Sequence, residues 1–274
     1  MNRFDELIAA RRPLWLDYAD YAGALLAGGQ APWLDVSALV AWQRKAQGLL
    51  RSDVVELPLG AVAAAWLDAH ATLRDAMAAK RRVGYPLRTL LADDDLRHHL
   101  AELAGGLRAS FASQPLAIAC PSPRRWLLES YRAAHGEVPE FDDDDVDSAA
   151  VYLADFLRLF GEIGIDVLLL QESLDSAPSD AASLACCQPV LNVAAHYRWI
   201  VGMATPAGRC EGDASLDFVV APEAVERRYV AQQIPAAFWT GAAVPDCPAG
   251  GFRYAGIPRD AQPEAVLQRL ASLR

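Results

Sequence analysis

Short apolar segments alternate along the chain with longer stretches in which apolar residues recur every three or four positions. Several of the short segments are almost continuously apolar, which is typical of parallel strands that are covered by helices. This pattern predicts eight strands, at residues 13–18, 53–59, 82–87, 115–120, 165–172, 198–204, 216–221 and 236–239.

Helices are predicted between these strands. Over residues 146–162 the apolar positions follow the helical period, and the acidic run 142–145 stands where carboxylates cap a helix and stabilise its dipole. Further helices are predicted over 60–79, over 94–112, and from Pro263 onward, where proline suits a first turn.

About eight strand–helix units in 274 residues predict one α/β domain, a (β/α)8 barrel of the TIM type that spans residues 1–274. A doubly wound sheet is the alternative. No G-x-G-x-x-G follows any predicted strand, however, and the chain has neither a P-loop nor a G-x-S-x-G turn. The barrel is therefore the fold class that we expect.

Composition narrows the classes of partner. Hydrophobic residues make up 53% of the chain, enough for a large folded core. The formal charge is −10, and a surface of that sign repels nucleic acid and anionic lipid. We expect neither as a partner, and we expect a small-molecule substrate, with a homodimer as the default assembly.

The cysteines and the first residues indicate the compartment. Five cysteines with irregular spacing predict no disulfide framework. Asp5 and Glu6 precede the first apolar stretch, unlike a signal peptide, and no apolar run approaches the ~20 residues that span a bilayer. We expect a cytoplasmic protein.

In a (β/α)8 barrel the chemistry takes place at the carboxyl ends of the strands. Asp17 and Glu172 both stand at such ends, where partial burial raises the pKa of a carboxyl and suits it to proton transfer. A carboxylate that is bound by arginine or caps a helix is the alternative. Glu56 interrupts an apolar strand inside the predicted barrel. It is a candidate for binding the substrate, and the alternative is a structural glutamate for which Arg88 is the partner that we expect.

Other residues at or near the strand ends complete the predicted site. Arg88 and Arg124 are candidates for binding an anionic substrate in bidentate fashion, although a solvated helix start would also explain Arg124. Tyr18 is a further catalytic candidate, and Tyr85 and Trp239 are candidates for binding the substrate. His196 precedes the sixth predicted strand, either as a base or as a packing residue.

Neither C-x-x-C nor H-E-x-x-H occurs, and we expect no cofactor. A zinc site formed by His196, Cys210 and Glu172 is the alternative, because ligands in barrels come from separate strands.

Four segments carry a resemblance to a known family. They are RFDELIAARRPLWL, LAIACPSPRRWLL, AAVYLADFLRLFGEIGIDVLLLQE and IPRDAQPEAVLQRL. Together they resemble the uroporphyrinogen decarboxylase-like superfamily, which includes cobalamin-independent methionine synthase and corrinoid:thiol methyltransferases. The first contains the family's P-x-W form at Pro13 and Trp15, and the third resembles its long helix and active-site strand.

Two family motifs are altered. Residues 17–21 read DYADY where the decarboxylases carry an arginine-rich segment that holds the carboxylates of a porphyrinogen, which argues against such a substrate. His196 is followed by Tyr197 and Arg198, so the H-x-C motif of the zinc methyltransferases is broken.

The resemblance and the residues together predict cofactor-independent decarboxylation of a small organic acid. Asp17 and Glu172 would transfer the proton, and Arg88 or Arg124 would hold the carboxylate. Two alternatives stay open. One is zinc-dependent methyl or alkyl transfer to a thiol, and the other is a barrel that binds a ligand or a partner protein without catalysis.

Overall fold

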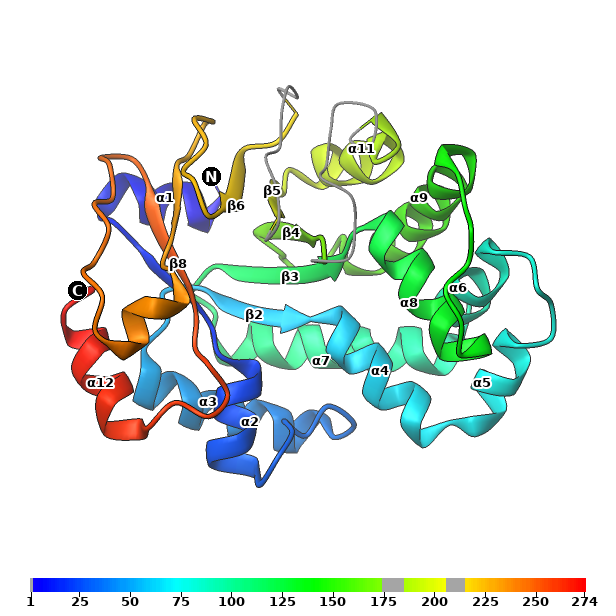
Figure 1. Ribbon diagram of the computed structural model, residues 1–274, viewed down its shortest axis with the longest axis horizontal. Helices are drawn as coiled ribbons and strands as arrows, with labels where there is room; N and C mark the ends of the chain where they lie inside the picture. The colour runs from blue at the N-terminus through cyan, green and yellow to red at the C-terminus, as the bar shows by residue number, and fades with distance from the viewer. Residues whose placement is uncertain (1, 174–184, 206–214) are drawn as a thin grey trace.

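The computed structural model describes residues 2–173, 185–205 and 215–274 (Figure 1). Within these ranges eight strands form one sheet in the order β1-β8-β7-β6-β5-β4-β3-β2, and every neighbouring pair is parallel. The strands are β1 (Leu14–Asp17), β2 (Val55–Pro58), β3 (Leu116–Pro121), β4 (Val167–Gln171), β5 (Ile200–Ala204), β6 (Phe218–Ala221), β7 (Ala231–Gln233) and β8 (Phe252–Gly256).

The two ends of this sheet meet. The Asp53 amide, just before β2, donates a hydrogen bond to the Leu14 carbonyl at 2.8 Å, and the Asp53 carboxylate accepts from the Leu14 amide at 2.7 Å. The Leu16 amide donates to Ser52 Oγ at 3.0 Å. These contacts join β1 to the segment that leads into β2, so the sheet is a nearly closed barrel, and the predicted TIM-type α/β fold is confirmed.

Helices surround the barrel. They are α1 (Arg3–Ala10), α2 (Ala19–Ala27), α3 (Val36–Leu50), α4 (Leu59–Ala69), α5 (Ala71–Met77), α6 (Gly84–Leu91), α7 (Asp94–Ser110), α8 (Pro123–His135), α9 (Asp143–Leu157), α11 (Gln188–Tyr197) and α12 (Pro263–Ala271), with short 3-10 turns η1 (Arg158–Phe160) and η2 (Ala236–Thr240). The arrow of β2 leads into α4 in Figure 1, and α8 follows β3. None of the helices that the structure describes is long and apolar enough to cross a membrane.

Six of the eight predicted strands are confirmed, and two are wrong. Residues 82–87 enter α6, because Leu87, Leu90 and Leu91 are buried along one helical face. Residues 236–239 lie in η2. The strands missed in their place are β7 and β8. The former has only three residues, and the latter includes Arg253.

The predicted helices are present, with one division. Residues 60–79 form α4 and α5, which are separated at His70. The predicted helix over 146–162 corresponds to α9 and η1, and Asp142 caps α9 by accepting a hydrogen bond from the Asp145 amide. The acidic run therefore acts as the predicted cap.

The core has two layers. An outer layer lies between the sheet and the helices, and an inner layer fills the barrel with side chains that include Trp15, Phe218 and Phe252. Phe218 packs so closely on Gly202 that a Cβ at that glycine would lie 2.1 Å from the ring. The inner layer thus fills the amino-terminal half of the barrel with aromatic rings.

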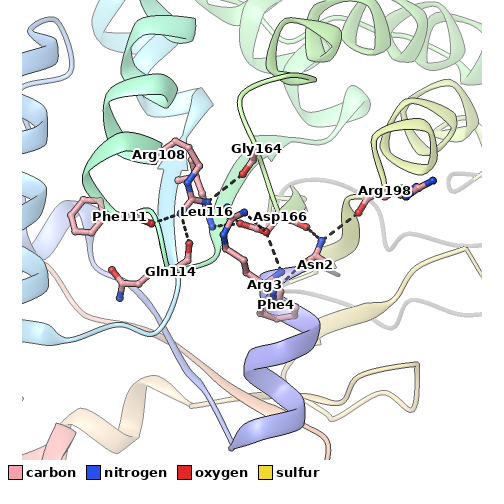
Figure 2. Close-up of polar contacts among 10 residues, drawn as sticks. All are labelled: Asn2, Arg3, Phe4, Arg108, Phe111, Gln114, Leu116, Gly164, Asp166 and Arg198. Carbon is pink, nitrogen blue, oxygen red and sulfur yellow. Dashed lines mark hydrogen bonds and ion pairs between the residues drawn. The ribbon is translucent and has the colours of Figure 1, made fainter.

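Helix α1 closes the amino-terminal end of the barrel. Its Phe4 is fully buried against the rings of Trp15, Phe218 and Phe252. Figure 2 shows how the buried Asp166 fastens this helix. The Asp166 carboxylate accepts from Arg108 at 3.0 Å and from Arg3 at 3.3 Å, and its carbonyl accepts from Asn2. Packed side chains and these polar contacts therefore close the amino-terminal end of the barrel.

Candidate active site

Two carboxyl groups lie inside the carboxyl-terminal half of the barrel, on β1 and β2. Trp15 belongs to the inner core layer, and alternation along β1 places Asp17 on the same inner side. Glu56 on β2 is in register with Ala117, another residue of the inner layer. The predicted position of Glu56 inside the barrel is therefore confirmed.

The hydrogen-bond partner of Glu56 differs from the expected one. Trp15 Nε1 donates to Glu56 Oε2 at 2.9 Å. Arg88, which we expected to pair with Glu56, is exposed near the end of α6, where its guanidinium lies 5.9 Å from the centre of the Tyr152 ring. The expected Glu56–Arg88 pair is wrong because residues 82–87 lead into a helix on the outside of the barrel rather than forming a strand.

Burial and mutual charge shift the proton affinities of this site. Burial raises the pKa of Glu56 well above its ordinary value, the charge of Asp17 raises it further, and the hydrogen bond from Trp15 opposes both effects. Burial and the charge of Asp20 raise the pKa of Asp17, against the hydrogen bond from the Ala19 amide. The Asp17–Glu56 pair therefore retains a proton at a pH where ordinary carboxyls have lost theirs.

Aromatic and amide side chains surround the pair. A small cavity of about 10 Å³ lies beside Asp17 and Glu56, and its lining includes Tyr18, Trp33 and Trp42. Gln43, which is also in the lining, donates from Nε2 to the Tyr18 hydroxyl at 2.7 Å. We call this space the Asp17–Glu56 cavity.

Several residues of the site were not predicted. Trp33, Trp42 and Gln43 come from α3 and the loop before it, and no strand-end argument could have found them. Tyr254 lies on the missed strand β8, in register with Trp15, and the charges of Asp17 and Glu56 raise its pKa in addition to the larger effect of burial. Predicting β8 would have identified it as an inward-facing residue.

Glu172 follows β4 and is only 8% exposed. Its Oε2 atom is buried and has no hydrogen-bond partner within the described ranges. The alternation of β4 places Glu172 on the side of Leu168 and Leu170, which face the helices. The carboxyl that interacts with Asp17 is therefore Glu56, and Glu172 is a separate acid at the rim.

The remaining predicted binding residues divide into two groups. Arg124 begins α8 beyond β3 and pairs with Asp143 at 3.1 Å, while the buried Trp239 donates to the Gly256 carbonyl at the end of β8. Both lie at strand ends. Tyr85 lies on α6 with Arg88, and α6 packs on α8 and α9 rather than on the barrel strands.

Two residues of the zinc alternative, His196 and Glu172, lie at opposite ends of the barrel. His196 is exposed in the last turn of α11, just before β5, and so lies at the amino-terminal end of that strand. Cys210 lies outside the described residues. In the part of the chain that is described, no group of three His, Cys, Asp or Glu residues could hold a metal ion.

Comparison with known proteins does not assign the chain to a family. No protein-family model matches the chain, and no similar sequence was found among curated proteins. The conclusion from fold and site is therefore a TIM-type barrel, a fold compatible with many enzymes, with a pair of half-buried carboxyls at its carboxyl-terminal face.

Proposed function

We propose that the protein is an enzyme in which the Asp17–Glu56 pair transfers a proton to a small substrate at the carboxyl-terminal face of the barrel. The reaction that we propose is cofactor-independent decarboxylation of a small organic acid, the lyase class of the uroporphyrinogen decarboxylase-like barrels. The observation that carries the proposal is the position of two carboxyls with raised pKa at the end where barrels perform catalysis.

The chemistry needs an acid that is protonated near neutral pH. Loss of CO2 from R–COO⁻ breaks the C–C bond and leaves the electron pair on carbon. A protonated Glu56 then gives its proton to that carbon, forming R–H and a Glu56 carboxylate, which regains a proton from solvent. Burial and the neighbouring Asp17 favour the protonated form of Glu56, as this role requires.

The substrate carboxylate needs a donor outside the pair. Arg124 stands at the end of β3 and is our candidate, although it would have to exchange Asp143 for the substrate. Glu172 is a second candidate contact, because its Oε2 has no hydrogen-bond partner among the described residues and can accept a hydrogen bond from a substrate hydroxyl or amine.

The test is a screen of small mono- and dicarboxylic acids for CO2 release in D2O. We expect product with one deuterium on the carbon that lost CO2, and we expect Glu56→Gln and Asp17→Asn to lower the rate by about 10²-fold or more. Asp68→Asn is the matched control, because the Asp68 side chain is 79% exposed and pairs only with Arg74 among the described residues.

Three outcomes are decisive. Loss of activity in both site variants with an unchanged control supports the proposal. An unchanged rate in Glu56→Gln would remove the pair from the mechanism. Binding of an acid without CO2 release would favour the alternative of a barrel that binds a ligand without catalysis.

A further inference from the structure

The Asp17–Glu56 cavity offers acceptors and aromatic rings but no positive charge. Its lining residues are Leu16, Asp17, Tyr18, Ala19, Trp33, Trp42, Gln43, Glu56 and Pro58. If the pair shares one proton, it carries one negative charge in a largely buried place. Such a charge is costly without a counter-charge, and the described lining does not supply one.

Two arginines that follow β3 are already neutralised. Arg124 pairs with Asp143 at 3.1 Å, and Arg125 pairs with Glu129 at 2.7 Å. Arg88 is on the outer helix α6. These three arginines do not supply the counter-charge of the Asp17–Glu56 pair, and a bound ligand can supply it.

Two amide side chains add to the excess of acceptors. Gln43 lines the cavity and is only 3% exposed, and its Nε2 is used by Tyr18, while no donor to its Oε1 is found among the described residues. Gln233 is in register with Tyr254, and its Oε1 is buried without a partner in the described part of the chain. Each of these two oxygens can accept a hydrogen bond from a ligand N–H group.

The size and the walls of the cavity agree with this. A space of about 10 Å³ admits a group of about the size of one water molecule. Trp33, Trp42 and Tyr18 line the cavity, and the faces of aromatic rings attract cations.

We propose that the Asp17–Glu56 cavity binds a primary ammonium group, so that the substrate is a small molecule with a cationic nitrogen. This inference rests on the proposed function, because it takes the same cavity as the active site. The ammonium cancels the single negative charge of the half-protonated pair, and the proton that the pair shares remains for the reaction.

The experiment titrates the full chain with methylammonium chloride, with sodium chloride at equal ionic strength as the reference. Tryptophan fluorescence reports binding through Trp33 and Trp42, and saturation-transfer NMR of the methyl protons confirms contact. Methanol and sodium acetate serve as neutral and anionic probes of similar size. We expect saturable binding of methylammonium only.

Variants assign the binding to the cavity. Glu56→Gln and Asp17→Asn should each weaken methylammonium binding by about tenfold or more, the factor that corresponds to ~1.4 kcal/mol of lost charge interaction. Asp68→Asn should bind as the wild type does. Two site variants are used so that the test survives if one of them fails to fold.

Affinity should also rise with pH until the pair has lost its first proton, because protons compete with the cation for the same oxygens. Binding of acetate in place of methylammonium, equal binding by Glu56→Gln, or no binding of either ion would each overturn the inference.

Failure of this inference and failure of the proposed function give different results. If methylammonium does not bind but CO2 release still depends on Glu56, the proposed proton transfer is supported and the proposed ammonium site is disproved. If methylammonium binds through Glu56 but replacing Glu56 leaves CO2 release unchanged, the cavity is a binding site and the proposed reaction falls.

Discussion

At the scale of single residues, Glu56 is held between opposing effects. The low polarity of the barrel interior and the charge of Asp17 favour its protonated form, while the indole N–H of Trp15 stabilises its ionised form. The effects that raise its pKa are larger, so folding increases the proton affinity of this carboxyl. A group of this kind links stability to pH in the direction opposite to that of a carboxylate in a salt bridge.

We therefore expect Glu56 to lower the free energy of unfolding as pH rises. Its pKa in the folded state is raised, so this loss is absent below the ordinary pKa of about 4.5 and grows as pH rises toward the folded pKa. Over that window, urea denaturation should show Glu56→Gln gaining stability relative to the wild type. The gain should be at most about 1.4 kcal/mol per pH unit.

The control for this experiment is Asp68→Asn, whose free energy of unfolding should follow the wild-type curve at every pH because Asp68 is exposed. A constant difference between Glu56→Gln and the wild type across the window would contradict the raised pKa.

At the scale of elements, α1 acts as the plug of the barrel, held by packing and by polar contacts. Phe4 enters the inner core layer, while Asp166, just before β4, binds both Arg3 of α1 and Arg108 of α7 (Figure 2). Asp166 also accepts a hydrogen bond from the Leu116 amide at the start of β3. One buried carboxylate thus ties three elements together.

Asp166→Asn should destabilise the protein by about 3 kcal/mol, because it leaves two arginines without their buried counter-charge. Urea denaturation measures the loss, and limited proteolysis should show earlier cleavage in α1. Asp155→Asn is the comparison, since Asp155 is 67% exposed and contacts Arg97 and Arg158 only at 3.6 Å or more. We expect it to change stability by about 0.5 kcal/mol or less. Equal losses in the two variants would disprove the special role of Asp166.

At the scale of the whole molecule, the barrel closes between β1 and β2 without a strand ladder, and we call this junction the seam. Seven strand pairs form parallel ladders, whereas β1 and β2 are joined through the segment before β2. The Ser52 hydroxyl accepts from the Leu16 amide and donates to the Val54 carbonyl, and Ser52 is buried. The Asp17–Glu56 cavity lies between these same two strands, so closure of the seam also forms the site.

Ser52→Ala should cost about 1–3 kcal/mol, because the buried Leu16 amide loses its acceptor. Hydrogen exchange followed by mass spectrometry should show faster exchange in β1, with β3 and β4 unchanged. Ser272→Ala, at an exposed hydroxyl that donates to the Arg269 carbonyl, should leave both quantities unchanged. Slow exchange in β1 of Ser52→Ala would mean that the seam does not depend on this hydroxyl.

Local patterns in the chain were enough for much of the fold. Continuous apolar runs identified six strands, and helical spacing with an acidic start identified α9 and its cap. The same runs placed Glu56 inside the barrel and Asp17 at a strand end. These features depend on residues that are close together in sequence. Each strand or helix buries one face or both, and this burial sets the apolar pattern of that segment by itself.

Tertiary structure decided everything that depends on closure of the barrel. The three residues of β7 form a strand only because β6 and β8 pair with them, and residues 82–87 enter a helix although their apolar run also fits a strand. Trp15 reaches Glu56 across 41 positions of the chain, and Gln43 and Trp33 reach the cavity from α3 and its preceding loop. Periodicity within one segment cannot specify which side chains meet across a barrel, because that depends on strand order, register and the packing of α3 against the seam.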